Sequence, residues 1–148
     1  MDELRLFLEQ SVIDAELLDV PDGASSAADA ASALGTQPEN IIKSLVFVVD
    51  EEPVLVIVSG NEKVDESIIA DLMEAEQCEI ADPDTVRDAT GYPIGGVPPV
   101  SLDLPKIVDE SVLGKEMVYG GGGDPDTVIK LDPRFIVDEE TIVEEVTI

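Results

Sequence analysis

Three segments of the sequence carry residue types that could form a binding or catalytic site. Lys43 lies where an expected helical turn leads into an expected buried strand, an unusual place for one of only five lysines. Residues 90–99 read TGYPIGGVPP, and residues 119–124 read YGGGGD. Each segment also has an ordinary structural explanation: a surface lysine, a tight loop and a flexible hairpin. The residues alone favour the surface lysine at Lys43 and the flexible hairpin at residues 119–124, and a tight loop is a common explanation of residues 90–99.

The chemical interpretation of residues 90–99 is a rigid cradle of main chain. Glycine allows a ligand to approach the backbone closely. The two prolines at the end of the segment have no N–H group. The available hydrogen-bond donors are therefore the backbone N–H groups of Gly95, Gly96 and Val97, which could stabilise a developing oxyanion.

Several classes of site are excluded by composition. The chain contains no histidine, so Ser-His, Cys-His and His-metal sites cannot form. Cys78 is the only cysteine, which excludes an internal disulfide and a C-x-x-C pair. Neither a P-loop nor a strand-to-helix G-x-G-x-x-G motif is present. Carboxylates are too abundant for a catalytic pair to be singled out, and we expect neither a metal nor a cofactor.

The charge is strongly negative, with 34 acidic and 8 basic residues and a net charge of −26. The acidic residues divide equally between the two halves of the chain, unlike an acidic tail or a segregated nucleic-acid mimic. We interpret this even excess as a surface adapted to molar salt, as in halophiles. Such charge repels itself in dilute buffer and is screened in concentrated salt.

Length and composition predict one domain spanning residues 1–148 with an aliphatic core. Of the residues, 44% are hydrophobic and only 3% aromatic. The start, Met1-Asp2-Glu3, is acidic where a signal or transit peptide would be basic. The longest apolar runs, 45–49 and 54–58, are far shorter than the roughly 18 residues of a membrane span. We therefore expect a cytoplasmic protein without a membrane partner.

Periodicity and capping residues predict a mixed α/β fold. Helices or helical turns are expected over residues 4–12, 25–35 and 38–42 and after Asp65, Asp82 and Asp132. Strands are expected over residues 45–50, 53–59, 78–81, 106–108, 116–118 and 127–131, whereas residues 141–148 fit either state. This order favours a mixed or barrel-like β core with helices around it over a regular parallel βαβ array.

Several segments, in order along the chain, resemble the YbaK/prolyl-tRNA-editing family, whose members are related to the editing domain inserted in bacterial prolyl-tRNA synthetases. IKSLV at 42–46 is similar to the family's K-[ST]-L-[VL] segment. ADP at 81–83 and TGYPIGGVPP at 90–99 resemble its ADP and TGYxxGGxxP signature. LPKIVD at 104–109 resembles its LP-x-[IV]-[IV]-D strand. The resemblance extends over residues 36–131, and residues 1–34 match too weakly for any residue to be transferred.

The resemblance implies a curved, mixed β core with surrounding helices and an activity as an aminoacyl-tRNA deacylase. Family members hydrolyse the ester between a wrongly attached amino acid and the 3′ end of a tRNA. The implied catalytic residues are Lys43, which aligns with the family's principal functional lysine, and Gly95, which begins its G-x-x-x-P loop. The implied substrate-binding residues are Gly96, Val97, Pro99, Tyr119 and Gly120.

The resemblance also indicates a substrate and partners. The commonest theme of the family is removal of alanine or cysteine from the tRNA for proline. The implied partner is the 3′ end of an aminoacyl-tRNA, not DNA. Because a protein of charge −26 repels phosphate, recognition should be short-range, with selection of the tRNA body weak or supplied by an aminoacyl-tRNA synthetase. Without histidine, proton transfer is assigned to the tRNA's own 2′ or 3′ hydroxyl.

The alternative is a non-catalytic module on the same fold that binds a tRNA end or a small molecule. The segment 119–124 keeps this alternative open, because it is longer than the family's loop and lacks that loop's basic residues. Retention of Lys43 and of the Gly95–Pro99 loop favours the hydrolase.

Overall fold

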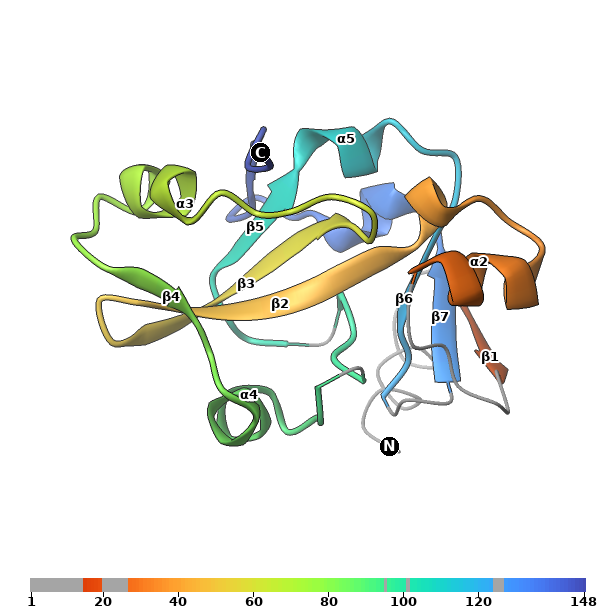
Figure 1. Cartoon of the computed structure of the whole chain (residues 1–148), viewed down its shortest axis with the longest axis horizontal. Helices are drawn as coiled ribbons and strands as arrows, with labels where there is room; N and C mark the ends of the chain where they lie inside the picture. The colour runs from red at the N-terminus through yellow and green to blue at the C-terminus, as the bar shows by residue number, and fades with distance from the viewer. Residues whose placement is uncertain (1–14, 20–26, 95, 101, 124–126) are drawn as a thin grey trace.

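Two β-sheets with short helices on their faces make up the computed structural model of the chain (Figure 1). The structure describes residues 15–19, 27–94, 96–100, 102–123 and 127–148. The mixed α/β fold with a β core and surrounding helices is therefore confirmed. The helix expected over residues 4–12 lies outside the described residues.

The larger sheet has five strands in the order β4-β2-β3-β5-β8. These strands are β4 (Cys78–Ile80), β2 (Ile42–Val49), β3 (Glu52–Ser59), β5 (Lys106–Asp109) and β8 (Ile142–Glu144). β2 is antiparallel to β3 and β4, whereas β5 is parallel to β3 and β8. The predicted β2–β3 hairpin is confirmed, although β2 begins at Ile42 rather than at residue 45. The carboxyl-terminal segment, which fitted either state, contains a strand.

The smaller sheet has three antiparallel strands in the order β1-β7-β6. They are β1 (Ala15–Asp19), β7 (Thr127–Leu131) and β6 (Val118–Gly121). β7 has the predicted bounds, and β1 was not predicted. The strand predicted over residues 116–118 was placed too early, because β6 runs through the glycines that follow Val118.

The helices are short, and three helical segments begin at the expected capping side chains. They are α2 (Ala27–Leu34), α3 (Glu66–Leu72), α4 (Pro83–Thr90) and α5 (Glu110–Leu113), with 3₁₀ turns at Pro38–Asn40 and Pro133–Ile136. Asp65, Asp82 and Asp132 each accept a hydrogen bond from the first turn that follows, as predicted. α5 was not predicted. Within the described residues, no helix is long and apolar enough to span a membrane.

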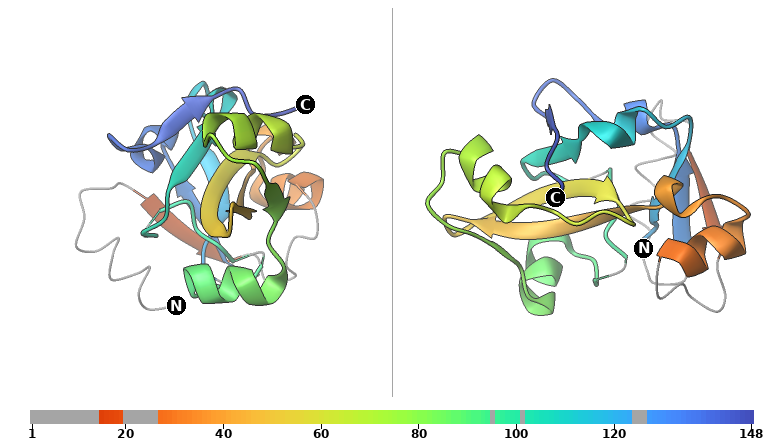
Figure 2. Two further views of the ribbon diagram at one scale, coloured as in Figure 1. Left: turned by 90° about the vertical axis from the view of Figure 1, so that its left-hand side faces the viewer. Right: turned by 45° about the horizontal axis from the view of Figure 1, so that its top comes forward.

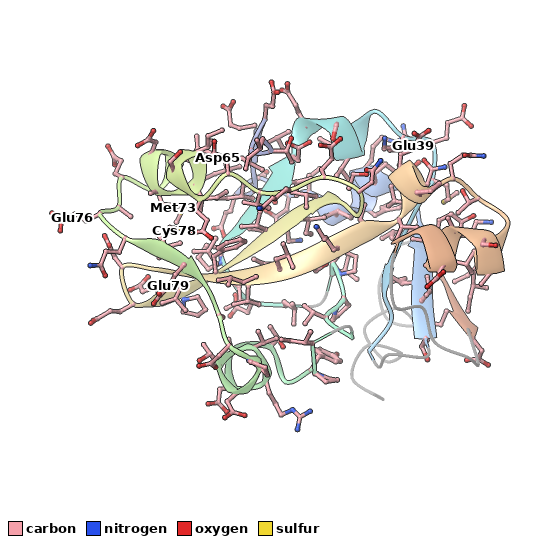
Figure 3. The ribbon with its side chains drawn as sticks, viewed as in Figure 1. Glu39, Asp65, Met73, Glu76, Cys78 and Glu79 are labelled. Carbon is pink, nitrogen blue, oxygen red and sulfur yellow. The ribbon has the colours of Figure 1, made fainter. Side chains whose placement is uncertain are left out.

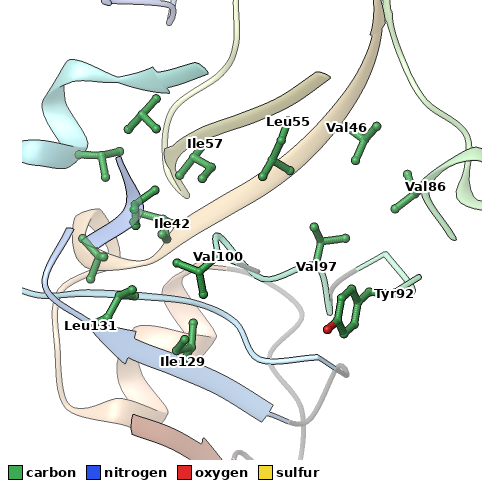
Figure 4. Close-up of a cluster of buried hydrophobic side chains, with 14 of the residues drawn as sticks. Ile42, Val46, Leu55, Ile57, Val86, Tyr92, Val97, Val100, Ile129 and Leu131 are labelled. Carbon is green, nitrogen blue, oxygen red and sulfur yellow. The ribbon is translucent and has the colours of Figure 1, made fainter. Parts of the chain in front are cut away.

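The five-stranded sheet is covered on both faces (Figure 2). α3 packs on one face through Ile69, in a cluster that includes Phe47 and Val56. The other face packs against α4, the three-stranded sheet and the side chains of Tyr92, Val97 and Val100. Figure 4 shows Val97 and Val100 in this second cluster, between side chains of the two sheets. The described core is mainly aliphatic, as composition predicted, with Phe47 and Tyr92 as its buried aromatic residues.

A buried carboxylate holds the end of the chain to β5. Asp109 is 1% exposed, and its two oxygens accept from the N–H groups of Val146 (2.8 Å) and Ser111 (3.2 Å). Nearby, Lys106 donates to the carbonyl of Ile136 at 2.6 Å, and burial lowers the pKa of this lysine. The LPKIVD segment therefore has a structural task in this fold.

Replacement of Asp109 by alanine should destabilise the protein by about 2 kcal/mol, because the buried N–H of Val146 and the part-buried N–H of Ser111 would lose their acceptor. Urea denaturation measures the free energy of unfolding. Asp103→Ala is the matched control, because Asp103 is an exposed carboxylate shortly before the same strand. Equal stabilities of the two variants would contradict this role.

The negative charge is scarcely compensated by pairing. Among the described residues, the one ion pair joins Arg134 and Asp132 at 2.6 Å. Most acidic side chains therefore act on one another through solvent, where repulsion depends on ionic strength.

We expect the melting temperature to rise between dilute buffer and molar KCl. The screening length falls from about 10 Å at 0.1 M to about 3 Å at 1 M, so most of the rise should occur below 1 M. Thermal unfolding followed by circular dichroism over a KCl series measures it. A melting temperature that is flat or falls with KCl would contradict the interpretation of the charge as an adaptation to salt.

Candidate functional site

Lys43 is the second residue of β2 and is half-buried. It pairs with Val58 of β3 in the antiparallel register. Because side chains alternate along a strand, Lys43 lies on the opposite side of β2 from Ile42. Ile42 faces the core between the sheets (Figure 4). Lys43 therefore does not point into that core.

β6 connects this end of β2 to the smaller sheet. Ile41 has an extended backbone (φ −84°, ψ 124°) and forms a parallel bridge with Tyr119. Lys43 follows Ile41 by two residues, and Gly121 follows Tyr119 by two residues. By strand alternation, the side chains of Lys43 and Tyr119 lie on one side of this junction. On the other side, a Cβ built on Gly120 would lie 3.0 Å from Cγ1 of Ile42.

The main chain after residue 95 lies directly against the glycines of β6. A Cβ built on Gly121 would lie 2.2 Å from the carbonyl oxygen of Val97, far inside contact distance. The N–H of Gly123 donates to the carbonyl of Gly96 at 2.9 Å. Pro99 borders Gly120, at 3.5 Å from the Cβ position. Gly120 and Gly121 therefore belong to the first strand of the β6–β7 hairpin, and this strand packs closely against a second stretch of backbone.

The next glycine is required by close contact with β7. Gly122 donates its N–H to the carbonyl of Thr127 at 3.0 Å. A Cβ built on Gly122 would lie 2.8 Å from the same carbonyl group. Gly121 is therefore required by its contact with Val97, and Gly122 by its contact with β7.

The backbone donors of the cradle are fewer than the sequence suggested. Gly96 is buried and donates its N–H to the carbonyl of Pro93 at 2.9 Å. The N–H of Val97 has no acceptor among the described residues. Gly95 lies outside those residues. Of the three donors that the sequence suggested, Val97 is thus the described residue whose N–H is available to a ligand.

The beginning of the glycine-proline segment anchors the loop. The hydroxyl of Thr90 donates to the carbonyl of Val86 (2.7 Å) and accepts from the N–H of Tyr92 (3.0 Å). Gly91 ends α4 with a positive φ of 80°, which glycine adopts without strain. The ring of Tyr92 is buried beside Val97 (Figure 4). These residues hold the loop in place rather than face a ligand.

Tyr119 lies beside a residue that the sequence analysis did not single out, Lys130. It pairs with Lys130 across β6 and β7, and the ammonium of Lys130 lies 5.9 Å from the centre of the Tyr119 ring. Both side chains are half-buried. Only the strand register, which the sequence does not reveal, joins these two residues.

Two other features do not belong to this junction. Cys78 lies beside Met73 below α3 (Figure 3). Burial, together with Glu66 and Glu79, raises the pKa of its thiol to about 11, so the thiol is protonated at neutral pH.

An open depression of about 710 Å³ between β4 and α4 is the second feature. Its rim carries the carboxylates of Glu51, Glu79, Asp82 and Asp88, with Val48 and Pro53 among the other lining residues. Acidic walls of this kind disfavour phosphate. No group of residues in the described part of the chain is arranged to hold a metal ion.

Comparison with known proteins gives one consistent result. Residues 21–138 match the model of a family described as aminoacyl-tRNA editing domain. The proline–tRNA ligases of Desulfovibrio desulfuricans and Lactobacillus acidophilus are each 32% identical to the chain, over 73% and 74% of its length. The chain spans only about a fifth of these relatives (19% and 20%).

Two solved structures resemble the chain over nearly their whole length. One is a hypothetical protein with a TM-score of 0.90 and 27% identity, covering 99% of both chains. The other is a proposed trans-editing enzyme for prolyl-tRNA synthetase, with a TM-score of 0.83 and 32% identity over 90% of this chain and 87% of that one.

Replacement of Gly121 by alanine should destabilise the protein by about 2 kcal/mol, because the added methyl group meets the Val97 carbonyl. Gly114→Ala is the control, since the nearest atom to its Cβ position is at an ordinary 3.6 Å. Urea denaturation of both variants measures the difference. If Gly121→Ala is as stable as Gly114→Ala, the contact between the loop and β6 is not tight.

Proposed function

Because the chain belongs to the aminoacyl-tRNA editing domain family, we propose that it hydrolyses the ester of a mischarged aminoacyl-tRNA. Water attacks the ester carbonyl, a new C–O bond forms, and the bond to the ribose oxygen breaks. The ribose oxygen takes up a proton, and the products are the free amino acid and the uncharged tRNA. No redox partner or covalent intermediate is needed, because the ester is already activated.

The observation that supports this proposal is the meeting of three segments that are far apart in the sequence. β6 forms a bridge beside the start of β2 and contacts the backbone of Gly96 and Val97. Lys43, Val97 and Tyr119 are thereby brought to one junction. A cation, a backbone donor and an aromatic ring are suitable groups for an ester attached to a nucleotide.

In this proposal Lys43 orients the aminoacyl group and the terminal ribose. The N–H groups of Val97 and Gly95 stabilise the oxyanion that develops on the ester carbonyl. Gly96, Pro99 and Gly120 act through shape, because Gly96 already uses its N–H and the other two lie in a buried contact. These roles correspond to interactions that are strongest in the transition state.

Proton transfer is assigned to the substrate. The chain has no histidine, and the Cys78 thiol is protonated and lies near the far end of β2, paired with Val49. The vicinal hydroxyl of the terminal ribose is adjacent to the reacting ester and can relay the proton. The protein then needs only to hold the ester, the water and the ribose in position.

The proposed substrate is a small amino acid, such as alanine or cysteine, on the tRNA for proline. The similarity to two proline–tRNA ligases and to the proposed trans-editing enzyme supports the choice of the tRNA, and the small amino acid is the one that the family resemblance implies. We further propose that the protein acts in trans as a single domain in the cytoplasm, with a synthetase as a second partner that helps to select the tRNA.

Lys43→Ala should lower the rate of deacylation by at least about 100-fold, as expected for loss of a group that acts in the transition state. Lys63→Ala is the matched control, because it removes the same charge from an exposed turn. Single-turnover deacylation of alanyl-tRNA for proline in concentrated KCl measures both rates. Equal rates for the two variants, with normal circular dichroism, would contradict the role of Lys43.

The second candidate is a binding module without turnover. The internal hydrogen bond of the Gly96 N–H favours it, because this donor is unavailable to an oxyanion. Such a module would bind uncharged tRNA ends without deacylating any member of a panel of mischarged tRNAs. Deacylation of a panel member by the wild-type protein would exclude this candidate.

A further inference from the structure

We propose that Tyr119 and Lys130 form the subsite for the terminal nucleotide of the tRNA. In this inference the tyrosine ring stacks on the terminal base, and the lysine ammonium binds a backbone phosphate. It rests on the proposed function and adds Lys130, which neither the sequence motifs nor the mechanism above uses.

Strand register places both side chains on the side of the small sheet away from the core. Tyr119 and Lys130 are paired across β6 and β7. The residues that alternate with them, Val118, Ile129 and Leu131, are fully buried between the sheets. Tyr119 and Lys130 therefore project to the other side, where they keep part of their surface exposed.

The ammonium of Lys130 lies over an aromatic ring, although a carboxylate is its neighbour on the adjacent strand. Across β1 and β7, Lys130 pairs with the exposed residue Glu16. The ion pair found in the described residues is nevertheless that of Arg134 and Asp132. The Lys130 ammonium lies over Tyr119 instead and forms no ion pair with a described carboxylate.

The local charge differs from that of the whole protein. The chain has a net charge of −26 and five lysines, and two of these lysines belong to this junction. The bridge between Ile41 and Tyr119 puts Lys43 on the same side as Tyr119. Lys130 lies over the ring and Lys43 lies on the same side of the neighbouring strand, so phosphate can approach here with less repulsion than over the acidic remainder.

An aromatic ring beside a cation matches the chemistry of a single-stranded nucleic acid end. Bases stack on tyrosine whatever their sequence, and lysine binds phosphate as a compact point charge. The neighbouring backbone of Val97 would then receive the ester attached to the same nucleotide. The subsite and the reacting bond are thus within one junction.

The test measures binding of a fluorescent single-stranded RNA that ends in CCA, over a series of KCl concentrations. Tyr119→Leu should weaken binding about tenfold through loss of stacking, and Tyr119→Phe should bind as the wild type does. Lys130→Gln should weaken binding in dilute salt and reduce the slope of log K against log salt by roughly 0.7, the value for one phosphate contact on a single strand. Lys63→Gln is the control for charge.

The outcomes separate this inference from the proposed function. If Lys130→Gln and Tyr119→Leu bind the RNA as Lys63→Gln does, or if the wild type does not bind it, the subsite is wrong even where mischarged tRNA is deacylated. If both variants weaken binding while the wild type deacylates nothing, the subsite stands and the hydrolase is wrong. Thermal melting of Tyr119→Phe and Lys130→Gln shows whether a loss of binding reflects unfolding.

Discussion

The arrangement depends on one close backbone contact, between the glycines of β6 and the main chain at Gly96 and Val97. The carbonyl of Val97 occupies space that any side chain at residue 121 would need. The hydrogen bond from Gly123 to Gly96 holds the two segments together. Because this contact also seats β6 beside β2, it brings the small sheet, the loop and the lysine-bearing strand to one place.

The rest of the fold keeps that contact in position. The loop is tied at its start by Thr90 and by the buried ring of Tyr92, and Val97 and Val100 fill the core between the sheets (Figure 4). Rigid anchoring of this kind suits a site that works through placed backbone donors, since such donors need no reorganisation when charge develops. It also explains why a segment of glycine and proline is largely buried.

Under the proposed function, the distribution of charge determines which part of a nucleic acid the candidate site can recognise. A chain with 34 acidic residues, and with one ion pair in its described part, disfavours extended contact with a polyanion. The junction of β2, β6 and β7 is different, because Lys130 lies over Tyr119 and the neighbouring strand β2 carries Lys43. Recognition concentrated on the end of the nucleic acid is consistent with both facts.

The sequence by itself determined the elements whose signals are local. The acidic caps at Asp65, Asp82 and Asp132, the β2–β3 hairpin and the aliphatic core all follow from neighbouring residues or composition. It also singled out the three segments that meet at the site. Only the tertiary structure decided that the glycine run is a strand, that the Gly96 N–H is already bonded, and that Lys130 lies over Tyr119. Each of these depends on partners distant in the chain, and strand register and close backbone contact leave no local pattern from which they can be predicted.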